Sequence, residues 1–235
     1  MKKIAFLACL FAVGTAQAQI VESSNGNYAL IPATGTNTID LSAKTAGYSF
    51  KIYDDGGPAA NYADNASGSM LITVPEGCQV KVKGVVYTEY NNDYLCIYDG
   101  ENTSEAVLSK VSGGYDDTNL SYSVEAIGSG QNMLLRFVSD GSSNATGLNI
   151  TATIVNYVKD GSFLYSDDSK TEIVKYVGGT TTIPATVKSI AACAFKGSNL
   201  TTLSIPATVE NIGTEAFASV VNINYSGAAT GSPWG

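Results

Sequence analysis

Thr182–Ile190 reads TIPATVKSI, and the same pattern returns as SIPATVENI at Ser204–Ile212. Ala194–Phe195 returns as Ala216–Phe217 at the same shift of 22 residues. Self-similarity at a fixed period of this length is typical of a solenoid, in which no unit buries its own apolar face and neighbours must stack. We therefore expect each unit to supply a short strand ending in Ile-Pro, a turn and a second layer closed by Ala-Phe. A degenerate unit, at about residues 161–182, precedes the two clear ones.

Upstream of the repeats, apolar and polar residues alternate in short runs separated by Gly, Asn, Asp and Pro. The clearest runs are Gln79–Lys83, Tyr94–Tyr98, Met133–Val138 and Leu148–Val155. A period of two places one face of each strand in the core and the other in water, and frequent turns favour an antiparallel sandwich. No stretch has a clear helical period, so the sequence predicts an all-β chain.

The N-terminus has the organisation of a secretory signal peptide. Lys2–Lys3 is a positive segment, Ile4–Val13 is an apolar run too short to span a bilayer, and Ala16–Ala18 fits an A-x-A cleavage site. A secreted or surface-held product with no membrane insertion is expected. The predicted organisation is a signal peptide over 1–18, a sandwich over 19–158 and repeats over 159–235.

Composition excludes several classes of function. The formal net charge is −8 and Arg136 is the single arginine, whereas nucleic-acid binding needs a clustered basic footprint. The chain contains no histidine, which excludes a Ser-His-Asp triad, a Cys-His pair and a histidine-ligated zinc site. Carboxylate chemistry, amine or hydroxyl nucleophiles and oxygen-ligated metals remain.

The cysteines downstream of the signal peptide are Cys78, Cys96 and Cys193, with no C-x-x-C pair. Export would permit a disulfide. Strand parity argues against one, because Cys78 shares a face with Val80 whereas Cys96 lies opposite Leu95. Cys193 is predicted to be a small buried core residue.

The first region resembles a CUB domain of the bacterial kind. The matching segments include Tyr53–Gly57, Val74–Gly77, Asp93–Gly100, Phe137–Asp140 and Gly147–Leu148. The resemblance implies an antiparallel jelly-roll β-sandwich that binds proteins or glycans and has no catalytic activity of its own.

The repeats resemble the BspA-type leucine-rich family, whose motif is similar to I-P-x-x-V-x-x-I-x-x-x-A-F. The tail, Tyr225–Gly227 and Ser232–Gly235, resembles the ends of such arrays. The resemblance implies a secreted bacterial protein of the Bacteroides type, in which adhesion is the usual role of these repeats.

Many CUB domains hold calcium through acidic loop residues. By motif position, the resemblance implies that Glu89, Asp93 and Asp140 are the metal ligands, with Tyr62 in support. Calcium prefers several hard oxygens, which loops at one end of a sandwich can supply. Further oxygens are available from Ser142 and Asn144. The alternative is that the two aspartates are ordinary turn formers and Glu89 is a solvated rim residue.

Several tyrosines surround Glu89 in the sequence. Tyr87, Tyr90 and Tyr94 are candidate ligand-binding residues, and Tyr98 is close by, because tyrosine offers a large contact area at low entropic cost. The alternative is packing at the rim and edge of the sandwich.

Together these features predict a secreted or cell-surface binding protein that is not an enzyme and adheres to a host protein or glycan. Possible calcium is the only cofactor expected. A structural or assembly component of a surface complex is one alternative, and an accessory module of a secreted hydrolase is another. Two carboxylates suffice for glycoside hydrolysis, but nothing in the sequence marks a substrate cleft.

Overall fold

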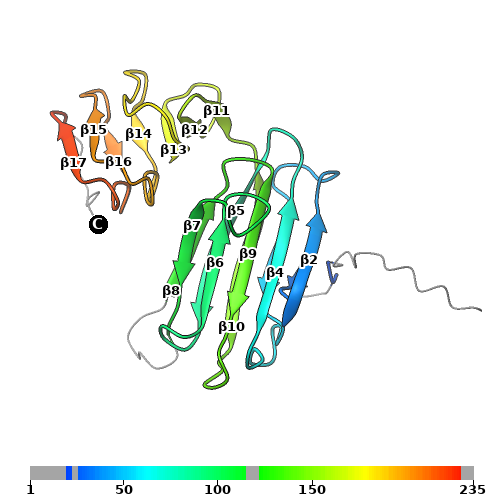
Figure 1. Cartoon of the computed structure of the whole chain (residues 1–235). Helices are drawn as coiled ribbons and strands as arrows, with labels where there is room; N and C mark the ends of the chain where they lie inside the picture. Colours follow the sequence, from blue (N-terminus) through cyan, green and yellow to red (C-terminus); the bar gives the residue numbers. More distant parts are fainter. Residues whose placement is uncertain (1–19, 23–25, 115–121, 229–235) are drawn as a thin grey trace, which may run out of the picture.

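The computed structural model describes residues 20–22, 26–114 and 122–228, and every regular element in them is a β-strand (Figure 1). The predicted all-β class is confirmed. The predicted signal peptide and the tail segment Ser232–Gly235 lie outside the described residues. A search of the described residues for a helix long and apolar enough to cross a membrane finds none.

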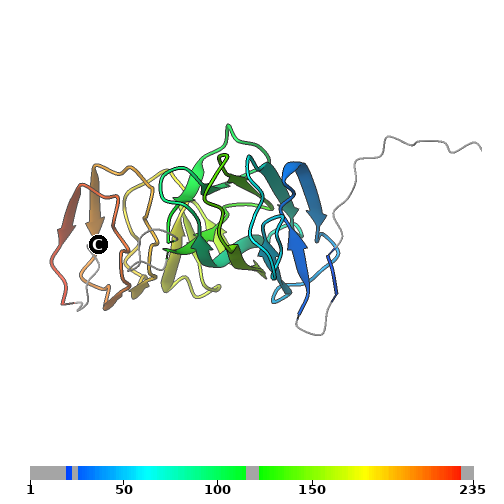
Figure 2. The ribbon, with the colours of Figure 1, turned by 90° about the horizontal axis from the view of Figure 1, so that it is seen from below.

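The first part of the chain forms two five-stranded sheets packed as a sandwich (Figures 1 and 2). In spatial order, one sheet contains β1 (Tyr28–Leu30), β3 (Ser49–Tyr53), β10 (Gly147–Val155), β5 (Gln79–Tyr87) and β8 (Tyr122–Ile127). The other contains β2 (Thr34–Asp40), β4 (Ser67–Thr73), β9 (Asn132–Val138), β6 (Tyr94–Tyr98) and β7 (Val107–Val111). The four runs predicted as strands correspond to β5, β6, β9 and β10.

The two sheets are not wholly antiparallel. β1 pairs with β3 and β2 pairs with β4 in parallel, whereas the other pairs of the sandwich are antiparallel. Both parallel strands lie at a sheet edge, and β2 follows β1 after three residues but joins the opposite sheet. No hairpin joins β1 to β3 or β2 to β4, because β1 and β2 follow each other in the chain but lie in different sheets. Neither pair is therefore required to be antiparallel.

The alternating faces meet in one core between the sheets. Val80 and Val82 of β5, Ile150 of β10 and Leu135 of β9 are at most 1% exposed. Phe137 packs edge-on against Tyr62, with the ring centroids 5.0 Å apart. At about 1.5–3 kcal/mol for each large side chain buried, this core is the main source of stability of the sandwich.

The second part of the chain begins with an antiparallel meander and continues in parallel. β11 (Val158–Asp160), β12 (Phe163–Tyr165) and β13 (Glu172–Tyr176) form the meander, and β14 (Ser189–Ile190) and β16 (Asn211–Ile212) follow in parallel. A separate parallel pair joins β15 (Thr202–Ile205) to β17 (Asn222–Tyr225). Ile190 pairs with Ile212, so equivalent residues of the two clear repeats are direct neighbours.

Aromatic rings fill the interior of the repeat region. Phe195 stacks on Tyr176 at a centroid distance of 5.4 Å and contacts Phe217 of the next repeat at 5.5 Å. Phe195 is 0% and Phe217 is 1% exposed. The recurring Ala-Phe pair therefore forms the continuous core of the stacked units, which is separate from the core of the sandwich.

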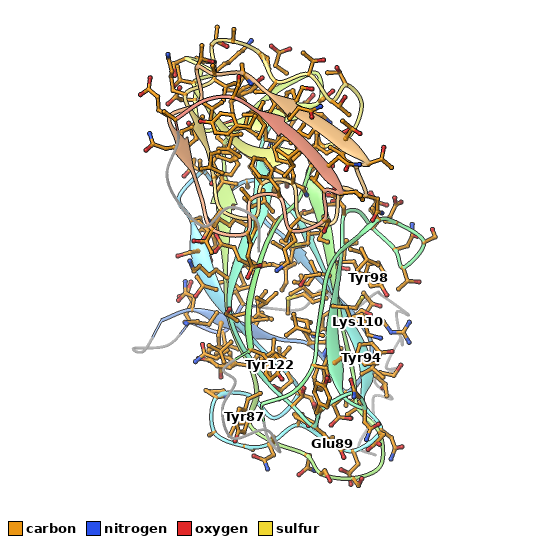
Figure 3. The ribbon with its side chains drawn as sticks, turned by 90° about the vertical axis from the view of Figure 1, so that its left-hand side faces the viewer. Tyr87, Glu89, Tyr94, Tyr98, Lys110 and Tyr122 are labelled. Carbon is orange, nitrogen blue, oxygen red and sulfur yellow. The ribbon has the colours of Figure 1, made fainter. Side chains whose placement is uncertain are left out.

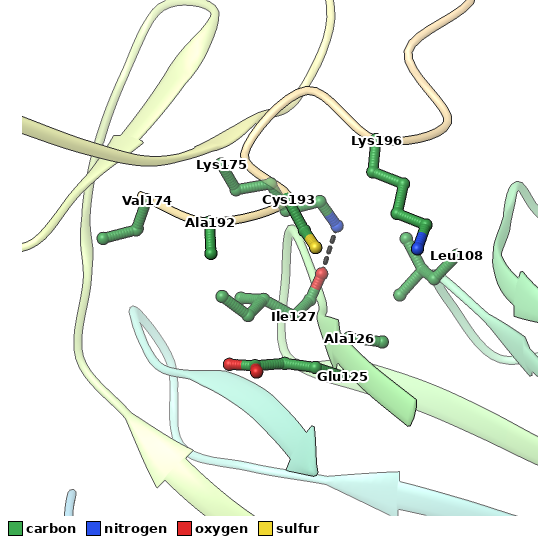
Figure 4. A pocket seen from close by; sticks show the side chains of 9 residues that line it. All are labelled: Leu108, Glu125, Ala126, Ile127, Val174, Lys175, Ala192, Cys193 and Lys196. Atoms are coloured by element: carbon green, nitrogen blue, oxygen red, sulfur yellow. Dashed lines mark hydrogen bonds between the residues drawn. The ribbon is translucent and has the colours of Figure 1, made fainter. Parts of the chain in front are cut away.

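The repeats contact the sandwich at a small junction (Figure 4). The ammonium of Lys175, whose side chain is 16% exposed, donates to the carbonyl of Ile127 and lies 3.4 Å from Asp99 Oδ2. Burial lowers the pKa of Lys175. The junction encloses about 50 Å³, which is room for ordered water but not for a ligand.

None of the three cysteines in the described residues forms a disulfide. Cys96 is buried, whereas Cys78 and Cys193 are partly exposed. The prediction that Cys193 is a buried core residue was wrong. Its backbone has the left-handed φ of 59°, and its side chain lines the junction rather than the core of the repeats, because the core position falls to Ala194.

Candidate metal centre and tyrosine surface at one end of the sandwich

The three predicted ligand carboxylates come together at one end of the sandwich. Glu89 follows β5, Asp93 precedes β6 and Asp140 follows β9. One carboxylate oxygen from each lies within 4.8 Å of the other two. The strands of both sheets therefore bring to one place three acids that are up to 51 positions apart in the sequence.

Asp93 is fixed at the centre of this cluster. It is 0% exposed, its Oδ1 accepts a hydrogen bond of 2.8 Å from the Asp140 amide, and its Oδ2 accepts one of 2.5 Å from the Tyr62 hydroxyl. The same hydroxyl accepts a 3.2 Å hydrogen bond from the Glu89 amide. Burial, and then the hydrogen bond to Asp93, raise the pKa of Tyr62, so its hydroxyl stays protonated as a donor. Tyr62 thus holds two of the three acidic loops together.

Two buried hydroxyls fix the loops that carry the acids. Thr88 Oγ1 donates to the Asp93 carbonyl at 3.0 Å and accepts from the Gly113 amide at 2.9 Å. Ser139 Oγ donates to the Ala63 carbonyl at 2.7 Å. Both residues are almost completely buried. Because these bonds cross between loops, the positions of the carboxylates are set before any ligand arrives.

The three acidic side chains lack a protein counter-ion: among the described residues, no Lys or Arg forms a salt bridge with Glu89, Asp93 or Asp140. Glu89 Oε2 is buried and accepts no hydrogen bond from this part of the chain. Like charges this close repel, and an unsatisfied buried carboxylate oxygen is costly. A hard divalent cation would satisfy that oxygen and neutralise the cluster, so the donor set fits calcium.

The two further oxygen donors suggested by the sequence have different positions. The amide of Ser142 donates to Asp140 Oδ1 at 3.0 Å, and its hydroxyl lies 3.5 Å from the same oxygen. Asn144 instead donates from Nδ2 to Asp64 Oδ1 at 3.0 Å, so its side chain braces a neighbouring loop. Tyr62 contacts the Ser143 carbonyl at 3.5 Å, a weaker link to the same loop.

The predicted tyrosine cluster divides between the two sheets (Figure 3). Tyr87 and Tyr90 lie beside Gly113–Gly114, which leaves room for their rings, and they are 38% and 49% exposed. Tyr122 lies at the same place but was not singled out in the sequence. Tyr94 belongs to the opposite sheet, where the Lys110 ammonium lies 3.9 Å from its ring centroid. Tyr94 is therefore not part of this surface.

The glycines explain why Tyr122 was missed. Gly113 and Gly114 have φ values of 111° and 106°, and a Cβ at either one would come within 3.0 Å of a tyrosine ring. Tyr122 pairs with Val86 across β5 and β8, and its ring lies against Gly113. The sequence does not show that β8 pairs with β5, so it gives no sign that Tyr122 lies near these glycines.

One family model matches this chain, and it covers a minor part. Residues 179–227 match the model described as a BspA-type leucine-rich repeat region of six copies. No curated protein matches the chain.

Parts of this chain are similar to solved structures of zebrafish, human and rat proteins. The full extracellular region of zebrafish Gpr126/Adgrg6 is 21% identical with a TM-score of 0.38, covering 52% of this chain and 15% of that one. The CUB1-EGF-CUB2 domain of human MASP-1/3 is 22% identical with a TM-score of 0.38, covering 46% of this chain and 42% of its own. Rat MASP-1 CUB1-EGF-CUB2 is 21% identical with a TM-score of 0.39, covering 53% and 44%. This chain thus spans less than half the length of each of these structures.

Proposed function

We propose that the protein is an extracellular binding module that adheres to a protein or glycan through the acidic end of its sandwich. Calcium held by Glu89, Asp93 and Asp140 would neutralise the acidic loops there, and the surface formed by Tyr87, Tyr90 and Tyr122 would supply the contact area. The repeats would extend the surface of the molecule or stack on another chain.

One observation carries this proposal. Glu89 Oε2 is a buried carboxylate oxygen without a hydrogen-bond partner in the described residues, and it belongs to a group of three acids within 4.8 Å. An ordinary solvated rim residue would have its oxygens in water. The exposed tyrosines beside the cluster favour a recognition role over a purely structural one, because tyrosine combines an apolar ring with a polar tip.

The metal part of the proposal predicts a calcium-dependent stability. At a calcium concentration of 100 times Kd, we expect the free energy of unfolding to rise by about 2.7 kcal/mol. Glu89→Gln, which keeps the shape and removes the charge, should abolish this rise. Glu76→Gln, in an exposed turn, is the matched control and should keep it. Thermal unfolding with calcium and with a chelator measures both, and an equal rise in both variants would refute the site.

The binding part is tested on an array of glycans and extracellular-matrix proteins, with calcium and with a chelator. Capture that is lost on chelation and in Glu89→Gln supports adhesion through the cluster. Capture that is indifferent to calcium would keep adhesion but reject this site for it. The absence of capture in either buffer would reject adhesion and favour the assembly role.

A further inference from the structure

We infer that the outer face of the sandwich carries a second binding site, a groove for a short neutral oligosaccharide. The groove lies between the loop that follows β3 and the adjacent ends of β5 and β10. The groove shares Tyr87 with the tyrosine surface described above, but none of the residues that line it is a proposed calcium ligand. The inference therefore rests on the proposed binding role and not on the calcium cluster.

The size and lining of the groove indicate the class of ligand. Its volume is about 460 Å³, within the range of about 300–1,000 Å³ typical of small-molecule sites. Among the residues that the structure describes, no Asp, Glu, Lys or Arg lines it, which favours an uncharged ligand. Tyr53 and Tyr87 line it together with Val85, which is 42% exposed although it lies on a sheet face. The negative face of a tyrosine ring attracts the weakly positive C–H groups of a sugar.

Two asparagines supply complementary polar groups. Asn149 Oδ1 accepts a 2.9 Å hydrogen bond from Lys51, which leaves its Nδ2 to donate. Asn61 Nδ2 donates to the Asn144 carbonyl at 3.1 Å, which leaves its Oδ1 to accept. A sugar hydroxyl both donates and accepts, so one donor amide and one acceptor amide flanking aromatic rings match its needs. Lys51 donates to Asn149 and is not one of the residues that line the groove.

The groove is rigid before any ligand binds. Asp54, which is 0% exposed, accepts hydrogen bonds from the amides of Gly56 and Leu148 at 3.0 and 2.7 Å and so ties the loop to β10. A Cβ at Gly147 would come within 1.9 Å of Asp54 Oδ2, so only glycine permits this approach. The Tyr53 ring is fixed by an edge-on contact with Tyr28 at 5.8 Å. A preformed site loses little conformational entropy on binding, which favours the binding of an uncharged ligand that forms no ion pair.

The test uses the full mature chain and a panel of neutral probes: lactose, cellobiose, maltotriose and triacetylchitotriose. Saturation-transfer NMR detects binding, and titration followed through the side-chain amide signals of Asn149 and Asn61 gives Kd. We expect at least one probe to bind and to shift both signals. Tyr87→Ala and Asn149→Ala should each weaken binding about tenfold, the effect of losing one good contact.

Two further variants keep the test independent of folding defects. Ala60→Trp adds a bulky ring on an exposed part of the rim and should abolish binding, whereas Tyr94→Ala, on the opposite sheet, should leave Kd unchanged. Thermal unfolding confirms that each variant is folded. Failure of every probe to bind, or wild-type Kd in Ala60→Trp and Asn149→Ala, would overturn the inference.

The groove and the calcium cluster can be tested independently of each other. Removal of calcium with a chelator should leave the oligosaccharide Kd unchanged while it abolishes the calcium-dependent rise in stability. A Kd that changes with calcium in the wild-type protein would overturn the assignment of the groove as an independent site.

Discussion

The sandwich and the repeats are both built from β-strands, but they place polar groups very differently. Of the buried polar residues in the described chain, only Ser162 lies in the repeats. The sandwich contains the others: Asp54, Ser69, Gln79, Thr88, Asp93 and Ser139. Burial of a polar group is costly unless it is hydrogen-bonded, so such groups mark places where the fold fixes a precise geometry.

Strand pairing explains the contrast. In the repeats, each residue of β14 pairs with the equivalent residue one period later, so the same apolar side chains stack again. In the sandwich, β3 pairs with β10, and loops about 90 residues apart in sequence meet at one end. Dissimilar segments can combine into a site, whereas stacked copies of one segment extend a surface. The candidate sites therefore lie where segments distant in sequence meet.

The largest expected effect tests whether the two cores are independent. Phe195→Ala removes the central ring of the repeat core, and we expect the repeats to lose about 3–5 kcal/mol of stability. The sandwich has a separate core and should keep its protected amides. Hydrogen exchange followed by mass spectrometry resolves the two regions. Phe137→Ala is the matched control, with the opposite pattern, and equal loss of protection everywhere would show one cooperative unit instead.

The next effect concerns the junction between the two regions. Lys175→Met removes a nearly buried cation and leaves Asp99, which is 13% exposed in its side chain, without it. We expect a loss of about 3 kcal/mol, because removing one partner leaves an uncompensated charge. Urea unfolding measures this loss. Lys196→Met, which removes an exposed surface pair with Glu215, is the control and should cost less than about 1 kcal/mol.

A smaller effect is expected from the buried carboxyl group of Asp54 in the sandwich. Burial raises the pKa of Asp54 to about 6, above the value of an unfolded chain. Between the unfolded and the folded pKa of Asp54, the folded state therefore binds more protons than the unfolded state does. The stability that protonated Asp54 contributes is lost as pH rises through about 6. We expect the free energy of unfolding to fall by about 1 kcal/mol between pH 5 and pH 7 because of this group.

Chemical denaturation at pH 5 and pH 7 measures the difference between the wild-type protein and Asp54→Asn. Asparagine does not titrate, so the wild-type protein should lose more stability over this interval than the variant does. A parallel pH dependence of the two proteins would show that Asp54 has an ordinary pKa.

Particular elements show how far sequence reasoning reached. The alternation in Leu148–Val155 predicted a strand and its buried face because apolar burial acts on every second residue. The repeat pattern predicted that neighbouring units stack, and Phe195 contacts Phe217 of the next repeat, because equal segments bury equal faces. The three acids were suggested by a resemblance rather than by local chemistry. Their calcium binding stays a prediction, although the structure brings them together.

The parts that were missed depend on register and on contacts between regions. Tyr122 lies beside Gly113 because β8 pairs with β5. Tyr94 lies apart from Tyr87 and Tyr90 because β6 belongs to the other sheet. Lys175 gave no signal in the sequence, since its partners are the Asp99 carboxylate and a backbone carbonyl of another region.

The all-β class, the repeat period and the inward face of the main strands follow from the sequence, because they depend on residue type and local spacing. The sequence also excludes catalytic and metal sites that need histidine, because it contains none. The tertiary structure alone decided that Glu89 Oε2 is buried without a hydrogen-bond partner in the described chain and that Tyr53, Asn149 and Tyr87 line one groove. These facts arise where loops and strands distant in sequence meet, and their geometry is set by the pairing of whole sheets, which no local pattern encodes.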